Sequence, residues 1–220
     1  LEREGSKWVQ KALLRHSDTS VDPVDQLGDS AAIAGAWIAL GAYGRDDGKS
    51  NQGAVYVFGR TANGKWNQTQ KLQPDSLTDG DIFGRSATLA MAGADLFAGA
   101  PKFTSSGVKD AGQVFYYRRG GNRYNLVQAL APTTTSARQF SRPVVDGNTL
   151  MIGAHDELVS GKKEGGVHVY VRTGATWAFK HLITLGPTVL KGPVNNLGAQ
   201  LGFSIAIDGE LAAVGAPQDS

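Results

Sequence analysis

Two short glycine-containing motifs carry residue types that take part in catalysis in other proteins. The first, Gly59-Arg-Thr-Ala-Asn-Gly64-Lys65, has most of the pattern of a P-loop, whose backbone amides and lysine hold phosphate groups. Trp66 follows at the place where Ser or Thr would bind magnesium, and no helix is predicted after it to direct its N-terminus at a phosphate. The segment is therefore predicted to be a hairpin turn between two strands.

The second motif, Gly202-Phe-Ser204-Ile-Ala206, approaches the nucleophile elbow of hydrolases. Ser30 and Ser86 stand at the same place in similar segments of the chain, so this serine is predicted to belong to a repeated scaffold. No acid–base pair and no nucleophile with a base stands out elsewhere. We therefore expect no enzymatic activity.

Metal-ligating residue types are few and scattered. The chain has four histidines, none of them paired at metal-ligand spacing, and no cysteine. His168 falls in a predicted strand. His155 stands beside Asp156 and Glu157, and this triplet is interpreted either as a polar site or as a solvated loop.

The composition excludes several classes of protein. The 220 residues include 22 Lys and Arg against 20 Asp and Glu, a net charge of +2, without the concentrated basic face that nucleic acid requires. No apolar run approaches the ~20 residues of a membrane span, so we expect no direct membrane insertion. Glycine is abundant, at 29 residues, and helical periodicity is absent, which favours an all-β protein.

A repeat of about 55 residues organises the chain. An aromatic residue recurs at spacings of 58, 58 and 53, and the four are Trp8, Trp66, Tyr124 and Trp177. A glycine–serine segment follows it, seen best in Phe83-Gly84-Arg85-Ser86 and degenerate in Phe140-Ser141-Arg142-Pro143. An apolar run that ends in Gly-Ala comes next, as in Gly99-Ala100-Pro101, and then an alternating strand such as Gly53–Phe58.

Each repeat therefore contains four short strands, which is typical of a β-propeller blade. Small residues at the ends of the inner strands suit the crowding near the propeller axis. We predict an all-β fold, a β-propeller built of four-stranded antiparallel blades, with about four blades and a single domain over residues 1–220. Gly28, Gly84 and Gly202 are predicted to lie at the innermost strands.

These segments also resemble the FG-GAP repeat, the blade unit of the integrin α-subunit propeller and of many bacterial surface proteins. Phe83-Gly84 with Gly99-Ala100-Pro101 is the best match, and the resemblance spans nearly the whole chain. It implies a seven-bladed propeller used for extracellular binding, often with calcium. Calcium-binding members carry a long Asp-rich loop before the Gly-Ala-Pro strand, whereas this chain has tight turns there, such as Ala92–Asp95, with too few oxygen ligands.

The register of the repeat places the ends of the chain inside blades. Arg3 precedes Trp8 by the same five residues that separate Arg172 from Trp177, so Leu1 corresponds to a position near the end of a third strand. We therefore expect the chain to be part of a larger propeller. The alternative is four blades that close on themselves, with the N-terminal strand completing the last blade.

Connection lengths distinguish the two ends of this predicted propeller. Strands alternate in direction within a blade, so the short connections one-to-two and three-to-four share one end, and the long connections share the other. Binding function concentrates in long loops on a rigid scaffold. Twelve of the 20 acidic residues fall in these long connections, and they are Asp18, Asp22, Asp25, Asp46, Asp47, Asp75, Asp79, Asp81, Asp110, Asp156, Glu157 and Glu164.

We predict a ligand-binding surface at this long-loop face. Its candidate residues are Asp46, Asp47, Asp75, Asp79, Asp81, His155, Asp156 and Glu157. No cofactor is expected. If calcium binds, it is expected to use Asp46 and Asp47, or Asp75, Asp79 and Asp81, and not the tight turns.

The first functional interpretation is a non-catalytic binding or adhesion module for a protein or carbohydrate ligand, extracellular or on a cell surface, with the periplasm as an alternative place. The FG-GAP resemblance supplies most of this interpretation. Two others stay open: a carbohydrate-binding propeller lectin, and a structural subunit or interaction platform in a larger assembly. Trp37, outside the periodic aromatic set, is interpreted either as a core residue or as a sugar-stacking platform.

Overall fold

The protein folds into antiparallel sheets stacked side by side. The structure, a computed structural model, describes residues 1–18, 25–185 and 198–218, which contain sixteen strands. No α-helix forms within these residues, so none of them makes a helix that could cross a membrane.

Twelve strands form three complete four-stranded sheets, each in the order of the chain. The first sheet is β3 (Ser30–Ala34), β4 (Trp37–Ala42), β5 (Ala54–Arg60) and β6 (Trp66–Leu72). The second is β7 (Leu89–Ala92), β8 (Asp95–Ala100), β9 (Gln113–Gly120) and β10 (Arg123–Leu130). The third is β11 (Phe140–Asp146), β12 (Thr149–Ala154), β13 (Gly166–Thr173) and β14 (Thr176–Ile183).

Two hairpins flank these sheets. The hairpin of β1 (Glu2–Glu4) and β2 (Lys7–Val9) corresponds to the third and fourth strands of the repeat. The hairpin of β15 (Ser204–Asp208) and β16 (Leu211–Gly215) corresponds to the first and second strands. The four-stranded antiparallel blades predicted from the repeat are thus confirmed, with three complete sheets and two half sheets among the described residues.

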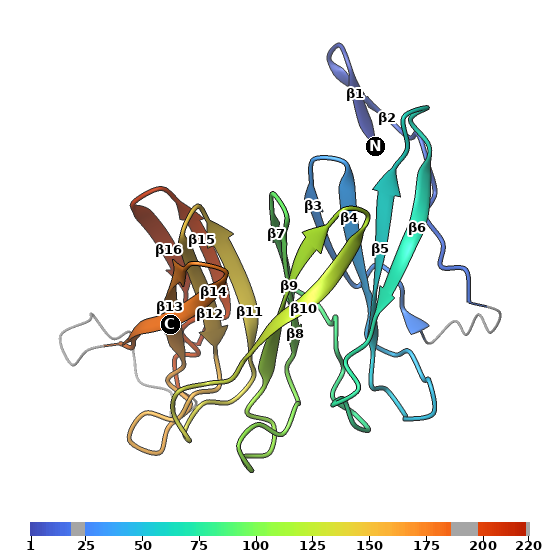
Figure 1. The fold of residues 1–220 in the computed structure, drawn as a ribbon. Coiled ribbons are helices and arrows are strands. Elements are labelled where there is room, and N and C mark those ends of the chain that lie inside the picture. The colour runs from blue at the N-terminus through green and yellow to red at the C-terminus, as the bar shows by residue number, and fades with distance from the viewer. Residues whose placement is uncertain (19–24, 186–197, 219–220) are drawn as a thin grey trace.

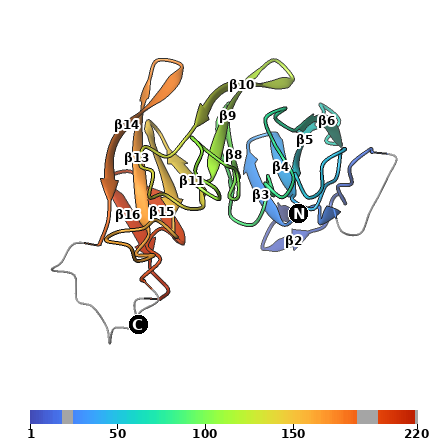
Figure 2. The same ribbon diagram turned by 90° about the horizontal axis from the view of Figure 1, so that it is seen from below.

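The sheets stand like spokes around one side of an axis and form an arc that does not close (Figures 1 and 2). Their first strands lie along the inner edge of this arc, where β3 contacts β7, β7 contacts β11 and β11 contacts β15. Gly28 and Gly202 lie two residues before β3 and β15, and Gly84 lies five residues before β7. Each donates its amide to the last glycine of the second strand of its own sheet. Their predicted position is confirmed.

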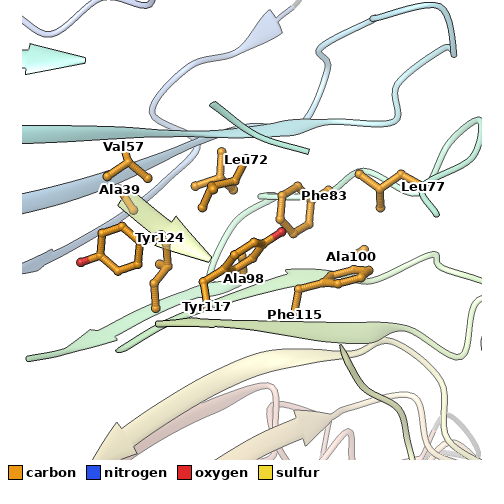
Figure 3. Close-up of a cluster of buried hydrophobic side chains, with 12 residues drawn as sticks. Ala39, Val57, Leu72, Leu77, Phe83, Ala98, Ala100, Phe115, Tyr117 and Tyr124 are labelled. Carbon is orange, nitrogen blue, oxygen red and sulfur yellow. The ribbon is translucent and has the colours of Figure 1, made fainter. Parts of the chain in front are cut away.

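Apolar side chains fill the space between neighbouring sheets. Figure 3 shows the cluster between the first and second sheets, where Val57 and Leu72 face Phe115 and Tyr117, with Phe83 between them. The central strands β5 and β9 are rich in β-branched and aromatic residues and bury both of their faces, because each sheet is covered on both sides. A second cluster of the same kind lies between the second and third sheets.

Trp37 belongs to this packing and does not form an exposed platform. It packs against the first cluster, its ring meets the Tyr124 ring edge-on with 5.8 Å between centroids, and the Arg119 guanidinium lies 4.9 Å from its ring centre. Of the two interpretations of Trp37, the structure supports the core residue.

Outer strands are joined from sheet to sheet by glutamine side chains. The Gln70 amide donates to the backbone oxygen of Tyr124 and accepts from its N–H, both at 2.9 Å. Gln128 binds the backbone of Trp177 in the same way, at 3.0 and 2.9 Å. Because Gln70 and Gln128 each stand four residues after the recurring aromatic residue, this link is a property of the repeat.

Inner strands approach one another so closely that only glycine fits. A Cβ built on Gly41 would overlap the backbone oxygen of Gly84 in the next sheet. The same overlap occurs between Gly99 and the Ser141 oxygen, and between Gly153 and the Gly202 oxygen. The glycine of the Gly-Ala segment is therefore required by backbone contact between consecutive sheets.

This close approach predicts a large difference between two glycine substitutions. Gly99→Ala places its Cβ against the Ser141 backbone and must push two sheets apart, so we expect the free energy of unfolding to fall by about 3 kcal/mol. Gly120→Ala is the matched control, because Gly120 also lies in the second sheet and the nearest atom to its built Cβ, Asn125 Nδ2, is at an ordinary 3.7 Å. Urea unfolding of both variants measures the difference. Equal stabilities would contradict the contact.

Candidate functional site

All the long connections that the structure describes lie at one end of the molecule, the lower end in Figure 1. They are residues 43–53, 73–88, 101–112, 131–139 and 155–165, and the opposite end carries only tight turns. The grouping predicted from strand direction is confirmed for these loops. Most of the connections 16–26 and 186–200, with Asp22, lies outside the described residues.

Two of these loops, 45–53 and 75–83, are locked together by backbone hydrogen bonds. The Gly80 and Ile82 amides donate to the Ser50 and Asn51 oxygens at 2.8 and 3.0 Å. Carboxylates reinforce the contact, since Asp79 accepts from the Ser50 amide at 2.8 Å and Asp46 accepts from the Asn51 amide. The two loops thus form one continuous ordered surface, which we call the double-loop surface.

The five aspartates predicted in these loops have different environments. Asp46, Asp47, Asp75 and Asp79 are exposed, whereas Asp81 is buried. Burial raises the pKa of Asp81, against the opposing effect of its hydrogen bonds from the Thr78 amide and hydroxyl. Asp81 therefore shapes its own loop rather than facing a ligand.

Asp47 is part of an ionic cluster beneath the double-loop surface. Arg45 is buried and donates to Asp47 at 2.9 Å and to Asp25 at 3.0 Å. Lys71 pairs with both Asp47 and Asp18. Partial burial alone would raise the pKa of Asp47, but the hydrogen bonds from Lys71 and Arg45 outweigh it and hold that pKa below its usual value.

The third residue of each two-to-three loop occupies a repeated position, three residues after Ala42, Ala100 or Ala154. Its amide bonds back to that alanine, and its oxygen accepts from the glycine that directly precedes the third strand. The position holds Arg45 in the first sheet, Phe103 in the second and Glu157 in the third. We call these three residues the plug residues.

In the second and third sheets the plug residue contacts a side chain of the third strand at another repeated position, three residues after the glycine that directly precedes the strand. In the second sheet this partner is Phe115, whose ring centre lies 5.8 Å from that of Phe103. In the third sheet it is His168, whose Nε2 lies 2.7 Å from Glu157 Oε2. The same place therefore holds an apolar pair in one sheet and a polar pair in another.

The Glu157–His168 pair is almost completely enclosed, with side-chain exposures of 1% and 0%. Glu157 also accepts hydrogen bonds from the Thr134 and Ser136 hydroxyls at 2.6 and 3.3 Å. Burial alone would raise the pKa of Glu157, but His168 and the two hydroxyls outweigh it and lower that pKa. The pair thus ties the 155–165 loop to the 131–139 loop.

The contacts of His168 continue to Thr133. The Thr133 hydroxyl lies 3.4 Å from His168 Nδ1, so the order Thr133, His168, Glu157 is that of a nucleophile, base and acid. The His168 ring itself is fully buried and meets the Phe140 ring edge-on at 5.0 Å. The imidazole is therefore enclosed by protein side chains.

His155 and Asp156 are buried as well, at 5% and 7% exposure, so the interpretation of the triplet as a solvated loop is wrong. The reason is their position directly after β12, where the segment before β15 packs on them: the His155 ring meets Phe203 edge-on at 5.3 Å, and Gln200 donates to Asp156 at 3.0 Å. Asp156 pairs with Lys163 at 2.8 Å. Burial and the nearby Arg142 lower the pKa of His155 to about 4, so its imidazole is neutral at pH 7.

The predicted site residues thus fall into two separate groups at the same end: the exposed aspartates of the double-loop surface, and the buried triplet of the third sheet. Prediction from the sequence missed the cationic partners Arg45 and Lys71 and the partner role of His168. The signal was available, because Arg45 and His168 stand at fixed offsets from repeated glycine or alanine residues.

No group of three or more His, Asp or Glu side chains in residues 1–18, 25–185 and 198–218 is placed to hold a metal ion. Four of the five aspartates suggested for calcium, all except Asp75, are bound instead to backbone amides, to Lys71 or to Arg45. Calcium binding stays a prediction for these loops.

The plug contacts give a prediction about stability. His168→Phe alone leaves the Glu157 carboxylate buried with only its two hydroxyl partners, and we expect the free energy of unfolding to fall by about 3 kcal/mol. The double variant Glu157→Phe/His168→Phe recreates the Phe103–Phe115 pair of the second sheet. Because a buried ion pair can be replaced by packed apolar groups at little cost, we expect it to unfold within about 1 kcal/mol of the unsubstituted protein. A double variant as unstable as the single one would contradict the equivalence of the two sheets.

Radial four-stranded antiparallel sheets, joined by a repeated backbone contact at their inner edge, define a protein of the β-propeller type. Residues 8–58, from the fourth strand of one unit to the third strand of the next, match the family model of the FG-GAP repeat. The chain therefore contains an FG-GAP repeat over these residues. The comparison with curated proteins gives no match.

Proposed function

We propose that the protein is a non-catalytic binding or adhesion module, extracellular or on a cell surface, that engages a protein ligand through its long-loop face. The observation that carries the proposal is the double-loop surface, because it is both exposed and rigidly held. Backbone hydrogen bonds fix its two loops to each other. Four of its residues are exposed aspartates: Asp46, Asp47, Asp75 and Asp79. A preformed surface of this kind binds without the entropic cost of ordering a mobile loop.

The charge of this surface favours a cationic ligand. Asp75 is exposed, and its carboxylate makes no hydrogen bond or ion pair within the described residues, while Lys49 directs its ammonium inward to the Leu77 oxygen. Carboxylates at an exposed rim steer an oppositely charged partner and set the salt dependence of binding. An extracellular location is supported only by the FG-GAP repeat matched at residues 8–58.

The two other interpretations have less support. A lectin built of repeated sugar pockets would present similar side chains in each sheet, but the plug residues are an arginine, a phenylalanine and a glutamate. Trp37, the candidate stacking platform, packs between sheets. A structural subunit would also use an exposed face, and it would differ by binding one fixed partner permanently.

Binding to arrays of immobilised peptides with net charges of −4, 0 and +4, together with a glycan array, tests the proposal. We expect binding to the cationic peptides that weakens as salt rises above about 0.1 M, since screening shortens the reach of exposed charges. Asp75→Lys should lower this binding about tenfold without loss of stability, because the side chain supports no contact.

Asp208→Lys is the matched control, since Asp208 is also exposed but lies at the end of β15 beside the opposite, short-turn face. It should bind cationic peptides as the unsubstituted protein does. Equal losses in both variants would contradict the choice of face. Binding to glycans alone would replace the proposal with the lectin interpretation.

A further inference from the structure

One position of the repeat lies at the inner edge of successive sheets and holds a different side chain in most of them. It is the third residue of the Phe-Gly-x-Ser segment, occupied in successive repeats by Asp29, Arg85, Arg142 and Phe203. Because consecutive first strands contact one another, these residues follow each other around the axis. They lie where the first strands begin, which is the long-loop end.

A cavity of about 330 Å³ opens beside the middle members of this series. Its lining includes Arg85, Arg142, His155, Gln139 and Ser86, with Phe203 closing one side. The volume is at the lower end of the range for small-molecule sites. The cavity thus brings two guanidiniums, an imidazole, an amide and a hydroxyl to one place.

The two guanidiniums carry uncompensated positive charge. Arg142 lies 4.3 Å from the centre of the Phe203 ring and donates to the Phe203 oxygen at 2.9 Å, while Arg85 lies over the Tyr43 ring. Within the three described stretches of the chain, neither forms an ion pair with a carboxylate. Burial lowers the pKa of Arg142, and the positive charge of Arg85 lowers it further. The two guanidiniums are therefore close enough to repel each other.

Nearby carboxylates are already engaged. Asp29 accepts from the Ser86 amide and hydroxyl at 2.6 and 3.0 Å. Asp156 is paired with Lys163 and also accepts from Gln139 and Gln200. Asp29 keeps its negative charge because its donors are neutral, but two guanidiniums against this one unpaired carboxylate leave the charge around the cavity positive.

His155 adds an unused polar atom. The residue is 95% buried, lines the cavity, and its Nδ1 has no hydrogen-bond partner among the described residues. A buried polar atom without a partner costs free energy that a bound ligand would recover. A neutral imidazole can give one N–H to an anionic oxygen, as oxyanion sites in proteins do.

We propose that this axial cavity binds a small molecule through a phosphate, sulfate or carboxylate group held between Arg85 and Arg142. The guanidiniums donate to the anionic oxygens, and His155 and Gln139 supply neutral hydrogen bonds. Inner-edge residues form this site, and the double-loop surface does not contribute to it, so the site adds a second binding function to the one proposed above.

Calorimetric titration of the purified chain at low ionic strength and pH 7.5 tests the site, with inorganic phosphate, sulfate and succinate as separate probes. We expect at least one probe to bind with a Kd below about 1 mM. The comparison of the tetrahedral ions with succinate tells a phosphate or sulfate site from a carboxylate site. Failure of all three probes would overturn the proposal, and it would leave the peptide binding of the double-loop surface unaffected.

Two variants distinguish binding at this cavity from a general effect of the protein's positive charge. Arg85→Gln should weaken the binding about tenfold and leave the melting temperature unchanged, because Arg85 is exposed and touches only the Tyr43 ring. Arg123→Gln removes the same charge from the β9–β10 turn at the opposite end and should keep the affinity within twofold. Equal affinities in Arg85→Gln and the unsubstituted protein, or equal losses in both variants, would refute the assignment.

Discussion

The close contact between the backbones of consecutive sheets is the constraint on which the rest of the structure depends. At each junction the segment before a first strand pairs with the segment before the preceding third strand, as when the Phe83 and Phe140 amides donate to the Gln52 and Ala111 oxygens at 3.0 and 2.8 Å. The residue before each of these phenylalanines has positive φ, 51° at Ile82 and 54° at Gln139. Glycines opposite leave room for the contact. The sheets are thus joined by main chain as well as by apolar packing.

This junction also determines where binding can occur. The paired segments are the ends of the long connections, so the contact that joins two sheets fixes the loops of both sheets. The double-loop surface is the most developed case, since Gly80 and Ile82 continue the pairing into the loop. The plug residues support the two-to-three loops further, because the backbone of each plug residue bonds to both ends of its loop. Function at this end therefore rests on a support that the repeat itself provides.

Repeat-level features could be predicted from the sequence, and residue-level pairing could not. Spacing of Trp66, Tyr124 and Trp177 and the Gly-Ala segments predicted the four strands, the sheet order and the end at which the loops gather. The burial of His155 and Glu157 was missed, because acidic and histidine side chains in a loop predict solvent exposure unless their partners are known. Those partners, Phe203 for His155 and His168 for Glu157, come from other parts of the chain, and only the fold brings them together.

Comparison of equivalent positions between repeats points to candidate binding residues that no single motif reveals. Most Phe-Gly-x-Ser positions are constrained by backbone contact, yet the third position holds Asp29, Arg85, Arg142 and Phe203. A position that is structurally free at the inner edge can differ between sheets, and these differences produce a cavity with its own charge. Likewise the three plug residues make the same backbone hydrogen bonds but carry a cationic, an aromatic and an acidic side chain.

Hydrogen–deuterium exchange of the unliganded protein tests the central claim, that main-chain contacts between sheets hold the long-loop end rigid. The amides of Ile82, Phe83 and Gln139 lie outside the strands, yet each donates across a junction. They are expected to exchange as slowly as the amides within β5 and β9, because opening them requires separation of two sheets. Exchange of these amides as fast as that of the exposed Asp46 and Gly48 would contradict the account.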